Sequence, residues 1–405
     1  MTTITAVRCV RTRADGSWTV VRVETDEPGL YGVGSASDLY NPGAVAAVVE
    51  ELYAPQLAGR DPADITDIWH TLQASGYWRN GSITATALGA IDVALWDIKG
   101  KVAGLPVYQL LGGAARSAVP CYAHASGDDV DALIDDVARY VEDGWTVIRC
   151  QTGGYGGGGF VDGGRVALPR NAWTQRPFDE DAYLRSTPAM FERLRDRFGP
   201  ELKFNHDVHE HLSPNAAVEL SRRLDPYRLY YLEDALPPEQ SAWYRTLRQH
   251  STTPQAIGEL FTHPDDWRYL ITERLVDFVR ARVSKVGGIT GALRIAALAE
   301  AFGVRTAWQE GGDNDPLNFA AALHLDRALP NFGIQEENTF APAELEAFPG
   351  APVVEHGYVY LSDAPGLGVD VDEARAAALL GGGGTAGYHR PYHIDRLADG
   401  TVVRP

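Results

Sequence analysis

Residues 202–208, LKFNHDV, form a short and mostly apolar run that contains an acidic residue near its end. The same arrangement recurs in LYYLED and QAIGEL, so that Asp207, Glu233 and Glu259 follow one another at intervals of 26 residues. One strand with its crossover helix takes about 30 residues. The spacing therefore predicts that the three acids end three consecutive parallel strands and lie side by side at one end of a sheet.

Eight apolar runs of this kind occur, and most of them precede an amphipathic helical stretch. Repeated strand–helix units predict a parallel sheet, and eight of them predict a closed barrel. The expected fold class is α/β, with a modified (β/α)8 barrel of the TIM type over residues 116–340. The eight runs are 118–124, 146–151, 202–208, 229–234, 255–260, 278–288, 304–310 and 331–336.

The chain on either side of these runs follows other patterns. Residues 1–115 open with three β-rich runs, at 4–13, 18–26 and 29–37, and continue with helical periodicity. This part is expected to form an α+β capping domain. Residues 341–405 return to loops and short strands, and they are expected to pack back against the cap.

Three carboxylates that converge on one point repel one another unless a cation lies between them. Ligands that are all oxygen favour Mg²⁺, with waters and substrate oxygens completing the coordination. For any one of the three acids, capping of the following helix is an equally good explanation. The common register of Asp207, Glu233 and Glu259 favours the metal site.

The composition excludes several classes of protein. The net charge is −18 and no block of Lys and Arg stands out, so a nucleic-acid partner is not expected. Three widely spaced cysteines without a CxxC pair indicate buried thiols in a reducing compartment. Neither a signal peptide nor a membrane-spanning run is visible. A cytoplasmic protein that acts on a small molecule is expected.

A long insertion follows the second barrel run, at residues 152–180, and it holds eight glycines. Its glycine spacing does not open a helix, so a dinucleotide-binding loop is not favoured. A loop of this length at the carboxyl end of a barrel strand is typical of a lid or wall of an active site.

Several stretches of the chain, taken with the three acids, resemble the enolase superfamily. They resemble most the mannonate dehydratase subgroup, which includes the D-galactonate dehydratase family members and starvation-sensing proteins. The similarity runs over nearly the whole chain. The stretches are YWRNG, DVALWDIKGK, PVYQLLGG, IRCQ, HDVH, VGGITG, ALHLD and PNFGIQE.

The resemblance implies removal of the proton α to a carboxylate, followed by loss of the β-hydroxyl as water. It implies Mg²⁺ held by Asp207, Glu233 and Glu259, a small-molecule acid sugar or hydroxy acid as substrate, and a homo-oligomer. His209 matches an acid/base residue, although a purely structural role is the alternative. His206 and Glu210 alternate to the other face, where packing or surface positions are expected, and His211 stays unassigned.

Further positions match residues of the subgroup that line the mouth of the barrel. Arg149 matches a residue that forms the base together with a tyrosine, and Tyr155 is the candidate for that tyrosine. The remaining positions are expected to bind substrate, with salt bridges at the barrel mouth as the alternative. They are His124, Arg280, Gln309, Asp313 and Glu336.

The departures from the subgroup concern its proton carriers. Counting without gaps from Arg149 places Val161 where the tyrosine belongs, so either Tyr155 reaches in or the usual base is missing. Gln309 stands where the subgroup has a histidine, and an amide cannot carry protons at neutral pH.

Other departures lie outside the proton carriers. Leu39 aligns with an asparagine of the capping loop that Asn41 would replace after a small shift, and the tail TVVRP lacks a terminal tryptophan. Arg282 is too basic to act as a base, and Lys285 is expected to point away from the pocket.

The prediction from the sequence is a Mg²⁺-dependent lyase of the acid-sugar dehydratase type with a divergent substrate. Activity on D-mannonate is predicted to be weak or absent, because of Val161 and Gln309. The alternative is a non-catalytic ligand-binding or regulatory relative that keeps the metal site. The retained acids and His209 favour the enzyme.

Overall fold

The first three strands form an antiparallel meander in the computed structural model, which describes residues 2–13, 17–161, 167–172, 176–380 and 394–403. Helix α4 packs on this sheet so closely that a Cβ at Gly34 would lie 2.0 Å from Ala90 O. The elements are β1 (Ile4–Thr12), β2 (Trp18–Thr25), β3 (Tyr31–Ser35), α1 (Pro42–Ala47), η1 (Val48–Tyr53), α2 (Ala54–Leu57), α3 (Ile65–Ser75), α4 (Ser82–Ala103) and α5 (Val107–Leu110).

The eight predicted barrel strands are all present. Strands β4 to β10 pair in parallel with their sequence neighbours, and β11 returns to pair with β4. A bridge between Thr306 and Phe332 joins the two ends, which closes the barrel. The strands are β4 (Val119–Gly127), β5 (Val147–Thr152), β6 (Lys203–Asp207), β7 (Tyr231–Glu233), β8 (Gln255–Ile257), β9 (Phe278–Val279), β10 (Arg305–Thr306) and β11 (Gln335–Glu336).

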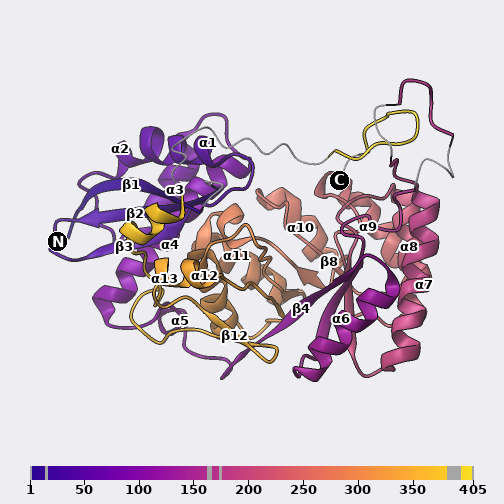
Figure 1. The fold of residues 1–405 in the computed structure, drawn as a ribbon. Coiled ribbons are helices and arrows are strands. Elements are labelled where there is room, and N and C mark those ends of the chain that lie inside the picture. Colours follow the sequence, from indigo (N-terminus) through magenta and orange to yellow (C-terminus); the bar gives the residue numbers. More distant parts are fainter. Residues whose placement is uncertain (1, 14–16, 162–166, 173–175, 381–393, 404–405) are drawn as a thin grey trace.

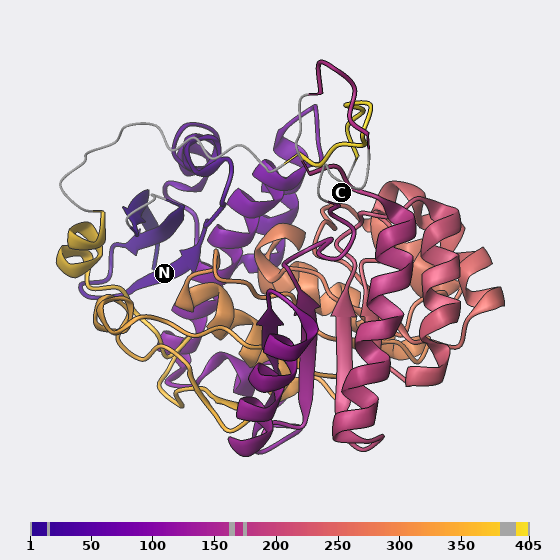
Figure 2. The ribbon, with the colours of Figure 1, turned by 45° about the vertical axis from the view of Figure 1, so that its right-hand side comes forward.

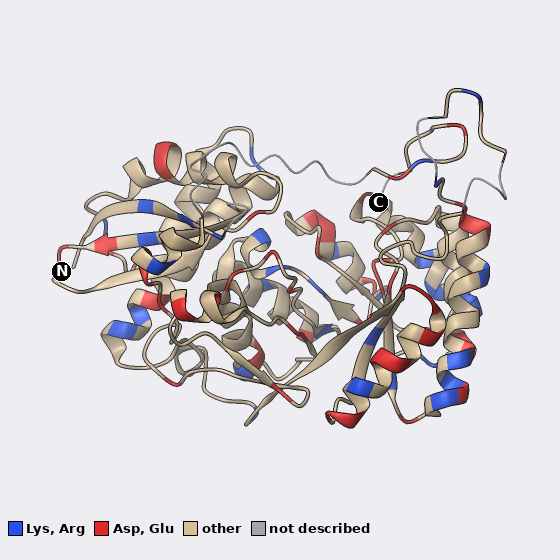
Figure 3. Cartoon of the chain, viewed as in Figure 1, with Lys and Arg blue, Asp and Glu red and all other residues tan. Residues whose placement is uncertain are grey.

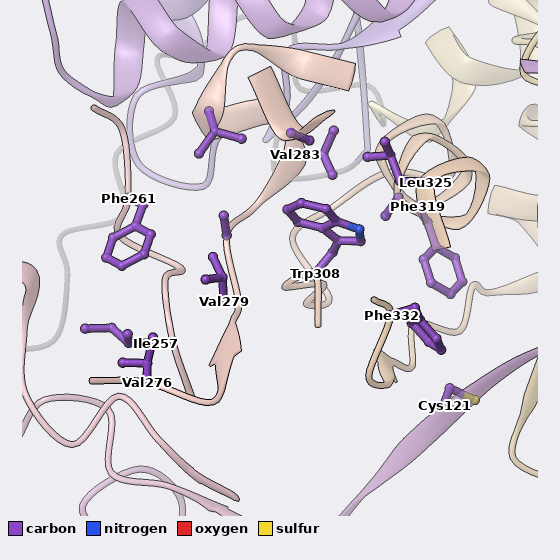
Figure 4. Packing of buried hydrophobic residues seen from close by; sticks show 14 of the residues in the cluster. Cys121, Ile257, Phe261, Val276, Val279, Val283, Trp308, Phe319, Leu325 and Phe332 are labelled. Carbon is purple, nitrogen blue, oxygen red and sulfur yellow. The ribbon is translucent and has the colours of Figure 1, made fainter. Parts of the chain in front are cut away.

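Helices surround this barrel, and Figures 1 and 2 show the capping domain beside it. Buried apolar side chains fill the space between strands and helices, with Trp308 amid Val279, Val283 and Phe319 (Figure 4). The helices are α6 (Val130–Glu142), α7 (Glu180–Phe198), α8 (Pro214–Leu224), η2 (Asp225–Tyr227), η3 (Pro238–Trp243), α9 (Tyr244–His250), α10 (Pro264–Thr272), η4 (Val283–Val286), α11 (Gly288–Ala301), α12 (Pro316–Ala328) and α13 (Pro342–Ala347).

The segment after the barrel contacts both domains. Its strands are β12 (Val353–Glu355) and β13 (Tyr358–Tyr360), and β13 pairs antiparallel with the start of β4. Helix α14 (Glu373–Leu379) packs on β1 of the cap. Arg8 Nη2 lies 2.5 Å from Glu373 Oε1, and Thr12 Oγ1 donates to Ala376 O over 2.9 Å.

Charged residues are distributed over both domains. Acidic and basic residues are interspersed on helices of both domains (Figure 3). Within the described part of the chain, no helix has both the length and the apolar composition needed to cross a lipid bilayer. Cys9, Cys121 and Cys150 are free thiols, and the last two are buried as predicted.

Candidate active site

A cavity of about 1050 Å³ lies over the carboxyl ends of the barrel strands. The cap covers one side of it through residues 38–41, and the insertion after β5 forms another wall through residues 153–160. This is the end of the barrel at which active sites of such folds are built. The polar residues of its wall include Asp38, Asn41, His124, Arg149, Tyr155, His209, Glu210, Glu259, Arg282, Lys285, Gln309, Asp313, Glu336 and Asp395.

Two buried arginines hold the carboxylates beneath this cavity. Arg280 donates from Nε to Glu233 Oε1 over 2.6 Å and from Nη2 to Glu336 Oε2 over 2.7 Å. Arg149 Nη1 lies 3.3 Å from Asp207 Oδ2. Arg280 is 0% exposed and is not part of the cavity wall, so its predicted contact with substrate stays a prediction. Its place is below the cavity floor, where it offsets the charge of two acids.

The carboxylates fit a divalent cation. One oxygen each of Asp207, Glu233 and Asp234 lies within 4.8 Å of the others, and this group does not include Glu259, the third predicted ligand. Glu233 Oε2 and Asp234 Oδ2 are buried without a hydrogen-bond partner. Burial raises the pKa of Asp207 to about 7; Arg149 opposes this rise, and the charge of Glu259 adds to it. Carboxylate oxygens without a hydrogen-bond donor repel one another, and a hard cation bound between them removes that repulsion.

The sequence reasoning missed Asp234 as a neighbour of this cluster. Asp234 directly follows Glu233 in YLED, but side chains alternate along a strand, so the side chain of Asp234 was expected on the opposite face from Glu233. A left-handed backbone at Asp234, with φ of 40°, ends the strand and changes that direction. Asp234 Oδ1 accepts from Gly258 N over 3.3 Å, which fixes the backbone beside Glu259. Glu259 itself lines the cavity.

The side chain of Tyr155 contacts Arg149. Counting residues without gaps from Arg149 had placed Val161 at this position instead. Arg149 Nη2 donates to the Tyr155 hydroxyl over 3.0 Å. Gly154 and Gly156, with φ of 82° and 66°, turn the loop back on both sides of the tyrosine. Val161 lies further along, where its backbone N–H donates to Pro177 O. The placement of Val161 at the tyrosine position is therefore wrong, because left-handed glycines shorten the path.

His209 lies against Tyr155. The two rings stack with their centroids 4.1 Å apart and an interplanar angle of 25°. The backbone N–H of His209 donates to Asp207 Oδ1 over 2.8 Å, and its Nε2 lies 3.4 Å from Glu259 Oε1. Burial raises the pKa of the Tyr155 phenol and outweighs the opposite effect of the Arg149 guanidinium. One phenol and one imidazole thus share the same wall of the cavity.

The remaining predicted substrate positions lie around the same space. His124 Nε2 is 2.9 Å from Glu336 Oε1, and burial, together with Arg149, lowers the pKa of His124 to about 4. Arg282 donates to Asp313 through two nitrogens, over 2.6 and 3.0 Å. Its Nε donates to Gln309 Oε1 over 2.7 Å. His124, Gln309, Asp313 and Glu336 line the cavity, each already held by a neighbour.

Two expectations about residues near the pocket are wrong. Lys285 lines the cavity instead of pointing away, because the short helix η4 turns it toward Asp38 of the cap, with which it forms an ion pair. Glu210 also lines the cavity, since its backbone is left-handed with φ of 64°. His206 does have a packing role: it lies 2.8 Å from the Tyr183 hydroxyl and from Cys150 O.

Comparisons with known proteins agree with this architecture. Residues 3–112 match the mandelate racemase / muconate lactonizing enzyme N-terminal domain, and residues 132–375 match the enolase C-terminal domain-like family. A D-galactonate dehydratase family member of Paenibacillus sp. (strain JDR-2) is 59% identical over 100% of both chains. One from Salmonella virchow (strain SL491) is 44% identical over 99% of each. The crystal structure of an enolase from Pantoea ananatis with bound D-gluconate and Mg is 43% identical, has a TM-score of 0.93 and covers 100% of both chains.

Proposed function

The chain belongs to the enolase superfamily and to its D-galactonate dehydratase family, and from that membership we propose that it is a Mg²⁺-dependent acid-sugar dehydratase. The observation that carries the proposal is the contact of Tyr155 with both Arg149 and His209 in the wall of the cavity. It brings two groups that can carry protons next to a set of carboxylates able to hold a cation.

Asp207, Glu233 and Glu259 are the residues that would hold Mg²⁺, with Asp234 fixing the backbone beside Glu259. The bound cation supplies positive charge that stabilises a substrate carboxylate while its α-carbon loses a proton. The two buried arginines keep the carboxylates in place and leave Glu233 Oε2 without a protein donor.

Tyr155 is the proposed base. Its oxygen takes the proton from C2 of the acid sugar, and the N–H of Arg149 that points at this oxygen partly offsets the rise in the phenol pKa that burial causes. The electrons of the C2–H bond form the C2–C3 double bond. The C3–O bond breaks as this double bond forms, and His209 gives its proton to the departing hydroxyl, which leaves as water. The enol product rearranges to a 3-deoxy-2-keto acid.

The stacking of Tyr155 on His209 also constrains the stereochemistry. Because both rings occupy one wall, proton removal at C2 and hydroxyl protonation at C3 take place from the same face of the substrate. A syn elimination is the expected course. Of two acid sugars that differ only at C2, one is therefore the better substrate when both are held in the same orientation.

Substrate choice is proposed to depend on the opposite side of the cavity. Gln309 and Asp313 are both bound to Arg282, so they present oxygen acceptors and an amide to substrate hydroxyls. Since Gln309 cannot exchange protons at neutral pH, we expect weak or absent D-mannonate activity. The relative from Pantoea ananatis binds D-gluconate, which supports an acid sugar as the substrate class.

Two further parts of the proposal concern the location and the oligomeric state of the enzyme. We propose that it works in the cytoplasm and as a homo-oligomer. Tyr77 and Trp78, which are 86% and 88% exposed, offer an apolar surface beside the cap that a second copy would cover. The domain limits at 115 and 340 stay a prediction.

The decisive experiment measures exchange of the C2 proton with deuterated solvent, by mass spectrometry, across a panel of acid sugars with Mg²⁺. Exchange or water loss with one panel member is expected, and Tyr155→Phe should lower it about 100-fold or more. Tyr358→Phe, at an exposed tyrosine, is the matched control. Exchange with no member while Mg²⁺ binds would instead indicate a non-catalytic ligand-binding relative. Efficient turnover of D-mannonate would overturn the substrate prediction.

A further inference from the structure

The C-terminal tail lies against the insertion that forms one wall of the cavity. Figures 1 and 2 show residues 394–403, in yellow, beside the loop that follows β5. The backbone N–H of Phe178 donates to Arg396 O over 2.9 Å, which fixes the tail to the end of that loop. Residues nearly 200 positions beyond the barrel acid Asp207 thus take part in the wall of the candidate active site.

Asp395 of this tail makes a buried ion pair with His211. Asp395 Oδ2 lies 2.7 Å from His211 Nε2, and His211 Nδ1 lies 3.0 Å from the carbonyl oxygen of Val208. Both ring nitrogens therefore face acceptors, so the imidazole carries a proton on each. Burial opposes this charge, but the contact with Asp395 outweighs it and raises the pKa of His211.

The ring of His211 supports the loop that carries Tyr155. A Cβ at Gly156 would lie only 2.9 Å from His211 Cδ2, so the loop backbone rests on the imidazole edge. The centroid of His211 is 5.8 Å from that of His209 and 5.6 Å from that of Phe178. The ring therefore fills the space beside Gly156, which is next to Tyr155 in the chain.

We propose that Asp395 is a positioning residue for the reaction: by holding the His211 ring in one orientation, it fixes the loop that sets Tyr155 between Arg149 and His209. The kinetic side of this inference rests on the proposed function. Asp395 does line the cavity, but its oxygen is engaged with His211. It acts on Tyr155 through the imidazole and the loop.

Three variants test the proposal. Asp395→Ala removes the partner of Nε2 and should lower kcat by about 10- to 100-fold, the effect of a small displacement of a reacting group. KM should change less than threefold in that variant. Asp395→Asn can donate its amide N–H to a neutral His211 ring, and it should restore kcat to within a few-fold of the parent. Asp399→Ala is the control, because Asp399 is exposed in the same tail.

A second readout does not depend on turnover. Amide hydrogen exchange of the peptide 153–160 should become faster in Asp395→Ala than in Asp399→Ala, and Asp395→Asn should exchange like the parent. Unchanged exchange in Asp395→Ala would overturn the proposal even if the enzyme were active. Loss of kcat equal in the alanine and asparagine variants would overturn it as well. If the parent protein turned over no acid sugar, the proposed function would fail, and exchange at 153–160 would still decide the role of Asp395.

Discussion

Arg280→Met removes the guanidinium beneath the cavity floor while it keeps most of the side-chain volume. Glu233 loses its hydrogen bond from Arg280, because Oε1 accepts from this arginine and Oε2 already has no partner. Glu336 keeps His124 at 2.9 Å and Arg149 at 3.4 Å. The change therefore isolates one buried carboxylate, and removing one partner of a buried ion pair costs about 3–5 kcal/mol.

The assay is urea unfolding, followed by near-UV circular dichroism, with EDTA or with saturating Mg²⁺. Arg245→Met is the control, since Arg245 and its partner Glu273 are 51% and 45% exposed and that pair should contribute about 1 kcal/mol or less. Mg²⁺ should recover more stability in Arg280→Met than in the parent protein, because the cation supplies charge next to Glu233. The reasoning is refuted if Arg280→Met unfolds at the same urea concentration as Arg245→Met, or if Mg²⁺ stabilises parent and variant equally.

Three further changes have outcomes that follow from the structure. Burial and the charge of Glu259 raise the pKa of Glu210 in the folded protein to about 9. Because the unfolded chain loses this proton at a lower pH, Glu210 reduces the stability of the folded protein as the pH rises above the ordinary pKa of a glutamate. Glu210→Gln should therefore stabilise the metal-free protein at pH 8, by at most about 1.4 kcal/mol per pH unit of that rise, with little effect near pH 5; equal effects at both pH values in thermal melts would contradict this. Gly156→Ala should lower the free energy of unfolding by about 1–3 kcal/mol and reduce kcat, because φ is 66° there, and full activity with normal stability would refute it. Tyr77→Ala with Trp78→Ala should leave the fold intact and lower the mass measured by light scattering, because the proposed homo-oligomer uses these side chains as its contact; an unchanged mass would contradict that contact.

The barrel and its three acids could be predicted because the signals are local and repeat. Each strand shows a short apolar run, and each of Asp207, Glu233 and Glu259 occurs near the end of one run. The spacing placed Asp207 beside Glu233, which the pairing of β6 with β7 confirms, whereas Glu259 lies three residues beyond Ala256, the residue that pairs with Glu233. The meander of the cap was readable for the same reason, from β-rich runs and the turns between them.

The rest of the site depends on backbone conformations that break this periodicity. Tyr155 reaches Arg149 through left-handed glycines, and Asp234 and Glu210 leave the strand pattern through positive φ values. Lys285 turns toward the cavity because a short helix follows β9. Spacing assumes an extended chain, so it misplaces residues wherever the chain turns. The ion pair of His211 with Asp395 joins two segments that are far apart in the sequence, so no local sequence pattern predicts it.

The packing of α14 on β1 has a consequence for how the protein is made. Arg8 and its partner Glu373 are 365 residues apart in the sequence. At about 5–20 residues per second, a ribosome needs roughly 20–70 s between making the first and the second. During that interval the nascent cap exposes the face that α14 will cover, and another nascent chain on the same messenger carries the same helix. Slow translation of the last third would lengthen this exposure, so chaperone binding and exchange of α14 between chains should be greatest under those conditions.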